Sequence, residues 1–196
     1  MPRSRRAEGG RWFALDFANT TACPACQGTD AFANLRDARV WTRRNSPAEM
    51  GHLRANELAM LRRFRDQLVA LLDSVADGSD PPSGALSSLN QAAGTPLPHP
   101  QLIRTSYGWK VGERGGEGRA SLRLSALAAR SVMDLLRGPS PEKIRRCLGP
   151  GCVHFLVDPM KSQRWCSPTG CGNRARVQRH YRKLRARRQR PPGRVR

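Results

Sequence analysis

Apolar residues recur at helical spacing through much of the chain. The longest stripe follows steps of three or four residues and consists of Leu58, Leu61, Phe64, Leu68, Leu72 and Val75. Such a period places these side chains on one face of a long helix, with Arg62, Arg63, Arg65 and Asp66 on the opposite face. We therefore expect this helix to build the core of a helical amino-terminal domain over residues 12–137.

Capping and breaking residues suggest where the helices of this domain begin and end. The run Ser46-Pro47-Ala48-Glu49 has the residues of a capping box and predicts a helix start at Ser46. A break at 77–82 is followed by a shorter helix that covers Leu86, Leu89 and Ala93, with Asp80 before Pro81 suited to its cap. Gly94 ends that helix.

A change to strand-like patterning follows the loop at 95–100. Residues 103–111 and 120–124 are predicted as two strands around a glycine-rich turn at 112–116, forming a hairpin near 103–124 that lies on the helices. Ser125 then caps a further helix, and Gly138-Pro139 marks a domain boundary. The expected fold class is mainly α, an α+β protein.

The final helix, predicted over 172–188, has only a narrow apolar seam. Val177, Tyr181 and Leu184 lie at i, i+4 and i+7, and this seam can dock on the preceding segment. The basic residues Arg176, Arg179, Arg182, Lys183 and Arg187 fall on the opposite face, and Arg174 and Arg185 flank the seam. The run 189–196 contains Pro191-Pro192-Gly193 and is expected to be disordered.

The basic charge is concentrated at the carboxyl-terminal end. The chain has a formal net charge of +20, and residues 138–196 hold sixteen basic residues against two acidic residues, Glu142 and Asp158. The preference for Arg over Lys can be explained by a GC-rich coding sequence as well as by function. Coding bias does not, however, account for the net charge. The imbalance indicates a polyanionic partner.

Secretion and membrane insertion are not indicated by the sequence. The start, Met1-Pro2-Arg3-Ser4-Arg5-Arg6, is not followed by an apolar segment, and no stretch is long enough to span a bilayer. We therefore expect a cytoplasmic protein. Six cysteines in a reducing compartment are more typical of metal ligands or free thiols than of structural disulfides.

Four cysteines have the spacing of a structural zinc site. Cys147 and Cys152 are separated by four residues that include Gly and Pro, and Cys166 and Cys171 repeat the same spacing. Two such turns can bring four thiolates onto one tetrahedral ion with no open position, so we expect one structural zinc. A disulfide pair or free core thiols are the alternatives. His154 could replace a cysteine, while Phe155, Leu156 and Trp165 are expected to cover the metal.

These residues resemble a known family. Trp165-Cys166, Cys171-Gly172-Asn173-Arg174, the upstream cysteines and residues 155–158 are similar to the CGNR zinc finger, which is named for the tetrapeptide. Residues 14–20, Ala-Leu-Asp-Phe-Ala-Asn-Thr, resemble the ABATE, or stress-induced transcription regulator, domain that accompanies it. The resemblance implies a zinc finger at 141–188, a bacterial origin and transcription regulation by DNA binding.

One cysteine pair departs from this family pattern. Cys23-Pro24-Ala25-Cys26 has no second pair close to it in the sequence, and its surroundings do not suggest a strand followed by a helix, as thioredoxin-like chemistry requires. We expect ordinary thiols here, with redox chemistry or a second metal as the alternatives.

The predicted function is that of a zinc-containing, non-enzymatic protein that binds duplex DNA. Arginine can donate two hydrogen bonds at once to a phosphate or to a guanine base. We therefore expect the DNA contacts to come from Arg174, Arg176, Arg179, Arg182, Lys183 and Arg187. An RNA- or ribosome-associated zinc protein is the alternative. A metal-dependent nuclease built on His154, Asn173 and His180 is a remote one, because no paired ligand accompanies them. The amino-terminal domain could sense a small molecule or form homodimers.

Overall fold

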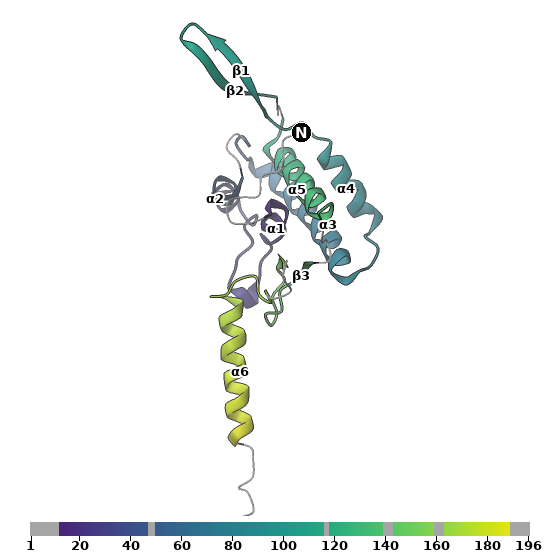
Figure 1. Cartoon of the computed structure of the whole chain (residues 1–196), viewed down its shortest axis with the longest axis vertical. Helices are drawn as coiled ribbons and strands as arrows, with labels where there is room; N and C mark the ends of the chain where they lie inside the picture. Colours follow the sequence, from purple (N-terminus) through teal and green to yellow (C-terminus); the bar gives the residue numbers. More distant parts are fainter. Residues whose placement is uncertain (1–11, 47–49, 116–117, 139–142, 159–162, 189–196) are drawn as a thin grey trace, which may run out of the picture.

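The chain folds into a helical body from which a β-hairpin and one long helix project (Figure 1). The computed structural model describes residues 12–46, 50–115, 118–138, 143–158 and 163–188, and only the backbone of 186–188. Its elements are α1 (Phe13–Ala18), the 3-10 turn η1 (Pro24–Cys26), α2 (Leu35–Asn45), the 3-10 turn η2 (Ala55–Glu57), α3 (Leu58–Asp77), α4 (Ser83–Ala93), β1 (His99–Thr105), β2 (Gly108–Arg114), α5 (Ala120–Leu136), β3 (Ile144–Arg146), β4 (Phe155–Val157) and α6 (Cys171–Arg188). The strands form two antiparallel pairs, β1–β2 and β3–β4. The predicted α+β class is confirmed.

Helices α3 and α5 form the centre of the core, and α1 and α4 pack against both (Figure 1). The predicted stripe on α3 is confirmed, because its first five members are buried and Val75 is partly buried. Aromatic rings fill the space next to α1, where Phe17 stacks against Phe32, Phe64 and Trp41. Burial of each such ring or leucine stabilises the fold by about 1.5–3 kcal/mol.

The start of α3 differs from the sequence prediction. Ser46 ends α2, where its hydroxyl donates to the carbonyl of Thr42, and residues 51–54 are not helical. The helix start expected at Ser46 is therefore wrong, and Pro47, Ala48 and Glu49 lie outside the described residues. The end of α2 needed a donor for its last carbonyls, and the serine supplies it.

A buried carboxylate, Glu57, instead connects the starts of α3 and α5. It accepts hydrogen bonds from the backbone N–H of Arg54 at 2.8 Å and from the N–H and hydroxyl of Ser121 at 3.0 and 2.8 Å. Burial raises the pKa of Glu57, but these hydrogen bonds outweigh burial and lower it overall. The carboxylate therefore stays ionised at the amino end of α5, where the helix dipole favours negative charge.

The hairpin is present, but its second strand and its position were predicted wrongly. Its turn lies at 106–107, and residues 120–124 form the first turn of α5. Leu124 belongs to a helical stripe with Ala120 and Ala128, and the alternation in Ser121-Leu122-Arg123-Leu124 was too short to reveal this. The hairpin projects from the helices (Figure 1), and Leu102, Trp109 and Val111 on one of its faces are exposed.

The last helix also stands away from the body (Figure 1). The seam that was expected to dock is exposed, with 46% of Val177, 61% of Tyr181 and 37% of Leu184 accessible to solvent. Helix α6 begins at Cys171, so its first turn is held against the other cysteines while the rest of the helix extends outward. None of the helices in the described part of the chain is both long and apolar enough to cross a membrane.

A buried ion pair ties the loop after η1 to the core. Sequence analysis placed Arg65 on the polar face of the helix, and this is wrong, because its side chain is only 5% exposed. Its two terminal nitrogens donate to the carboxylate of Asp30 at 2.6 and 2.7 Å. Arg65 also donates to the hydroxyl of Thr20. Burial raises the pKa of Asp30, but the hydrogen bonds from Arg65 and from the N–H of Phe32 lower it overall.

We predict that Asp30→Asn lowers the free energy of unfolding by about 3 kcal/mol, because it leaves the buried guanidinium without its counter-charge. Asp66→Asn is the matched control, because the Asp66 carboxylate also lies near this guanidinium, at 4.0 Å, but its side chain is 71% exposed. That change should cost less than about 1 kcal/mol. Urea unfolding at neutral pH measures both, and equal effects would contradict the assigned role of Asp30.

Candidate metal centre

Four cysteine sulfurs converge where β3, β4 and α6 meet. Cys147 and Cys152 lie on the turn after β3, Cys166 precedes a second turn, and Cys171 is the first residue of α6. The four Sγ atoms all lie within 4.8 Å of one another. The Sγ atoms of Cys152 and Cys166 are 3.8 Å apart, and those of Cys166 and Cys171 are 3.6 Å apart. Four sulfurs at zinc–sulfur distances of about 2.3 Å in a tetrahedron lie about 3.8 Å apart, so the group fits a zinc ion.

The backbone already stabilises one of these sulfurs as a thiolate. The N–H groups of Cys166 and Gly149 donate to Cys147 Sγ at 3.2 and 3.4 Å. Burial raises the pKa of Cys147, but these hydrogen bonds outweigh burial and lower the pKa overall. A thiolate is the form that binds a metal ion.

The remaining sulfurs need a cation to become thiolates together. Without one, burial and the neighbouring Cys171 and Cys147 raise the pKa of the Cys152 thiol to about 11, although the backbone of His154 acts in the opposite direction. Burial and the same neighbours raise the pKa of Cys166 as well. A divalent cation at the centre would reverse this balance, because it stabilises all four negative charges at once.

Glycine at position 149 is required by the close packing of the turn. A Cβ atom there would lie 2.9 Å from Cys171 Cβ and 3.0 Å from Cys171 Sγ. The adjacent Gly151 has a φ of +68°, a conformation that costs little only for glycine. The first turn can therefore approach the start of α6 only because no side chain intervenes.

The apolar residues between the cysteine pairs divide between two cores. Leu156 and Trp165 pack with the cysteines, as expected. Phe155 instead belongs to the main core of the amino-terminal domain, and Ile144 on β3 joins it there. The expectation that Phe155 covers the metal is therefore wrong, because strands β3 and β4 share one face with the helices.

Polar contacts lock the finger to the helical body, and sequence analysis did not identify them. The Asn19 side chain accepts from the N–H of Phe155 at 2.7 Å and donates to its carbonyl at 2.9 Å. Arg146 pairs with the Asp73 carboxylate through two 2.6 Å hydrogen bonds and covers the ring of Phe155. The motif at 14–20 was the available signal, since Asn19 is one of its residues.

The histidines do not join the sulfur cluster. His154 is half-buried, and its ring contacts the backbone of Thr21. His180 and Asn173 are exposed on α6. Among the described residues, both groups with metal-binding geometry consist of cysteines alone.

Five basic residues of α6 are exposed: Arg176, Arg179, Arg182, Lys183 and Arg185. Arg174 differs from them, because it is half-buried and donates to Cys171 Sγ at 3.0 Å. Its positive charge lies directly against the cysteine cluster. Of Arg187, only the backbone is described.

The structure also brings the amino-terminal cysteine pair to this centre. Cys23 and Cys26 are bonded to each other, so the expectation of ordinary thiols is wrong. Cys26 Sγ lies 3.4 Å from Cys152 Sγ. The sequence motif itself was visible, but its proximity to Cys152, 126 residues further along the chain, was not.

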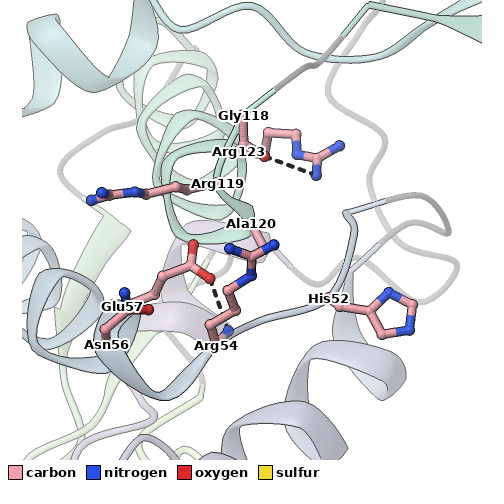
Figure 2. A pocket seen from close by; sticks show the side chains of 8 residues that line it. All are labelled: His52, Arg54, Asn56, Glu57, Gly118, Arg119, Ala120 and Arg123. Atoms are coloured by element: carbon pink, nitrogen blue, oxygen red, sulfur yellow. Dashed lines mark hydrogen bonds between the residues drawn. The ribbon is translucent and has the colours of Figure 1, made fainter.

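A separate cavity of about 560 Å³ opens at the amino ends of α3 and α5 (Figure 2). It is lined by His52, Arg54, Asn56, Glu57, Gly118, Arg119, Ala120 and Arg123. The carboxylate of Glu57 is already engaged by Ser121 and the backbone of Arg54. The three arginines make the lining cationic, which favours small anions over neutral or cationic molecules.

We predict that Cys166→Ser loses the zinc ion of the four-cysteine site, because a hydroxyl replaces one of four thiolates. Zinc analysis after dialysis against a chelator measures the loss. The whole chain should also melt at a lower temperature, since Ile144 and Phe155 connect the finger to the main core. Retention of this zinc in Cys166→Ser would contradict the assignment.

We further predict that Gly149→Ala weakens zinc binding by about 10–100-fold, the range seen when the surroundings of metal ligands are altered. The added methyl group would displace Cys171. Gly84→Ala on α4 is the control, because its Cβ would make only an ordinary contact with Gln67. Competition with a chromophoric chelator gives both affinities, and an unchanged affinity in Gly149→Ala would contradict the packing argument.

Two family models match the chain. The ABATE model, described as "Putative stress-induced transcription regulator", matches residues 12–139, and the CGNR zinc finger model matches residues 143–184. No curated protein matches the chain. The resemblance seen in the sequence is confirmed by both matches. Because the first covers well over half of the chain, the protein belongs to the ABATE family and carries a CGNR zinc finger whose four cysteines are placed to bind zinc.

Proposed function

We propose that the protein is a bacterial, cytoplasmic transcription regulator that binds duplex DNA through its zinc finger and α6. The observation that supports this most is the surface of α6, which projects from the metal centre with five exposed basic side chains. The sequence contains no acidic residue after Asp158, so no neighbouring carboxylate on the helix offsets these charges. A surface of one sign favours a polyanionic ligand.

Repulsion within α6 strengthens this proposal. Arg179 has basic neighbours three residues before it, at Arg176, and three and four residues after it, at Arg182 and Lys183. Like charges at these spacings destabilise a helix by about 0.2–0.5 kcal/mol per pair. Phosphates along a nucleic acid would replace this repulsion with attraction and release bound counterions.

The metal centre would set the direction of this helix. Cys171 is both a candidate zinc ligand and the first residue of α6, and Arg174 one turn later donates to its sulfur. A helix fixed at its first turn and free along its length can enter the major groove of duplex DNA. We therefore assign phosphate and base contacts to the exposed Arg176, Arg179, Arg182 and Lys183, together with Arg187, and rank Arg174 below them.

Duplex DNA accounts for the surface better than RNA does. Single-stranded RNA is bound largely by stacking of bases on exposed aromatic rings. In the described part of the carboxyl-terminal segment, 163–188, Tyr181 is exposed while Trp165 packs with the cysteines. The major groove of double-stranded RNA is too deep and narrow for side chains to read.

A binding role also agrees better with the site than catalysis does. All four candidate ligands are cysteines, an arrangement typical of structural zinc with no open position for substrate. Both matching family descriptions are of regulator or zinc-finger type. We therefore assign no catalytic residue.

We predict that binding to duplex DNA weakens as salt increases, with the slope of log affinity against log salt near 0.9 per phosphate neutralised. Changing Arg179, Arg182 and Lys183 together to Gln should lower that slope by about three and weaken binding to all sequences. Fluorescence anisotropy with a labelled duplex at several salt concentrations provides the measurement.

The matched control changes three exposed arginines of α2, Arg36, Arg43 and Arg44, to Gln. It removes the same net charge but should leave the slope nearly unchanged. Equal effects of the two triple variants would show that net charge alone drives binding. Tighter binding to a structured RNA than to the duplex would favour the RNA-associated alternative.

A further inference from the structure

The turn at η1 packs directly against the first turn of the zinc finger. Cys23 is fully buried, and Cys26 Sγ lies 3.4 Å from Cys152 Sγ and 3.6 Å from Cys171 Sγ. A Cβ atom on Gly151 would lie 3.0 Å from the Ala25 Cβ. The two turns are therefore in close contact, and all six cysteines of the chain lie in one cluster.

We propose that Cys23 and Cys26, once reduced, hold a second zinc ion that shares Cys152 and Cys171 with the first. The Sγ atoms of Cys23, Cys26 and Cys152 all lie within 4.8 Å of one another, as do those of the four-cysteine site. The separations of Cys26 Sγ from Cys152 Sγ and Cys171 Sγ are close to the value of about 3.8 Å expected between ligands of one zinc ion. We assign the fourth position to Cys171 on its 3.6 Å separation from Cys26 Sγ, although Cys171 lies outside the group formed by Cys23, Cys26 and Cys152.

The local backbone presents the pair as a ligand turn. The N–H groups of Cys26 and Gly28 both donate to the carbonyl of Cys23, at 2.8 and 3.1 Å, and a β-bridge joins Cys23 to Gly28. Gln27 adopts a left-handed conformation with a φ of 56°. These contacts close a tight turn that carries two sulfurs, which is the arrangement of the other two cysteine pairs.

Binding of the second ion requires reduction of the bond between Cys23 and Cys26. A dithiol reductant supplies two electrons and two protons, so that the S–S bond becomes two thiols and the reductant becomes a disulfide. Both thiols then lose a proton to solvent as zinc binds their sulfurs. The oxidised protein therefore holds one zinc ion and the reduced protein holds two.

The charge of the cluster is compatible with two ions. One zinc with four thiolates has a net charge of −2, and two zincs with six thiolates, two of them shared, also have −2. The guanidinium of Arg174 lies 3.0 Å from Cys171 Sγ and 3.6 Å from Cys26 Sγ. The same positive group therefore balances the cluster in either state. Zn₂Cys₆ modules that place a helix on DNA use this ligand count.

The test is the number of zinc ions per chain in untagged, full-length protein. The protein is reduced with a phosphine, loaded with zinc, desalted and analysed for metal and for protein. The reduced wild type should hold two zinc ions, and the oxidised wild type one. Cys23→Ser and Cys26→Ser should each hold one under reducing conditions. The retained ion, with an unchanged circular dichroism spectrum, shows that these variants are folded.

Replacement of zinc by ¹¹³Cd tests the shared sulfur. The reduced protein should give two ¹¹³Cd resonances that split each other, because a common thiolate connects the two ions. One metal ion in the reduced wild type, or two in Cys23→Ser, would overturn the second site. Two resonances without mutual splitting would overturn the sharing of Cys152 and Cys171. DNA binding does not enter any of these measurements.

Discussion

One electrostatic requirement dominates the metal centre: four closely packed cysteine sulfurs, of which those of Cys147 and Cys171 are buried, must share a cation. Burial disfavours the thiolate form of Cys152 and Cys166, and backbone N–H groups offset this only at Cys147. Zinc supplies the missing positive charge and, by binding both turns, fixes the start of α6 relative to β3 and β4.

The finger is joined to the helical body through its strands. Ile144 and Phe155 are buried in the same core as α3 and α5, and Asn19 and Asp73 bind the backbone or side chains of the two strands. A change in the packing of α1 or α3 would therefore reach the metal centre through rigid contacts.

The exposed apolar and basic faces of α6 follow from the same geometry. Because the metal centre holds the first turn, the seam of Val177, Tyr181 and Leu184 stays exposed in the described part of the chain. An isolated helix of this length is marginally stable in water, and its basic side chains repel one another. In the proposed function, the phosphates of a bound duplex would offset this repulsion, and the helix and the zinc site would act as one binding unit.

Features that depend on the local spacing of residues could be predicted from the amino-acid sequence. Each of three features involves residues that lie close together in the sequence: the apolar stripe of α3, the two matched cysteine pairs and the basic run of α6. Their spacing was therefore enough to predict them. Features that depend on contacts between residues far apart in the sequence became visible only in the folded structure. Residues 120–124 became helical because Leu124 faces the core, and the seam of α6 stayed exposed because the helix points away. The proximity of Cys26 to Cys152 likewise arises from the packing of η1 on a turn 126 residues away, which no local pattern encodes.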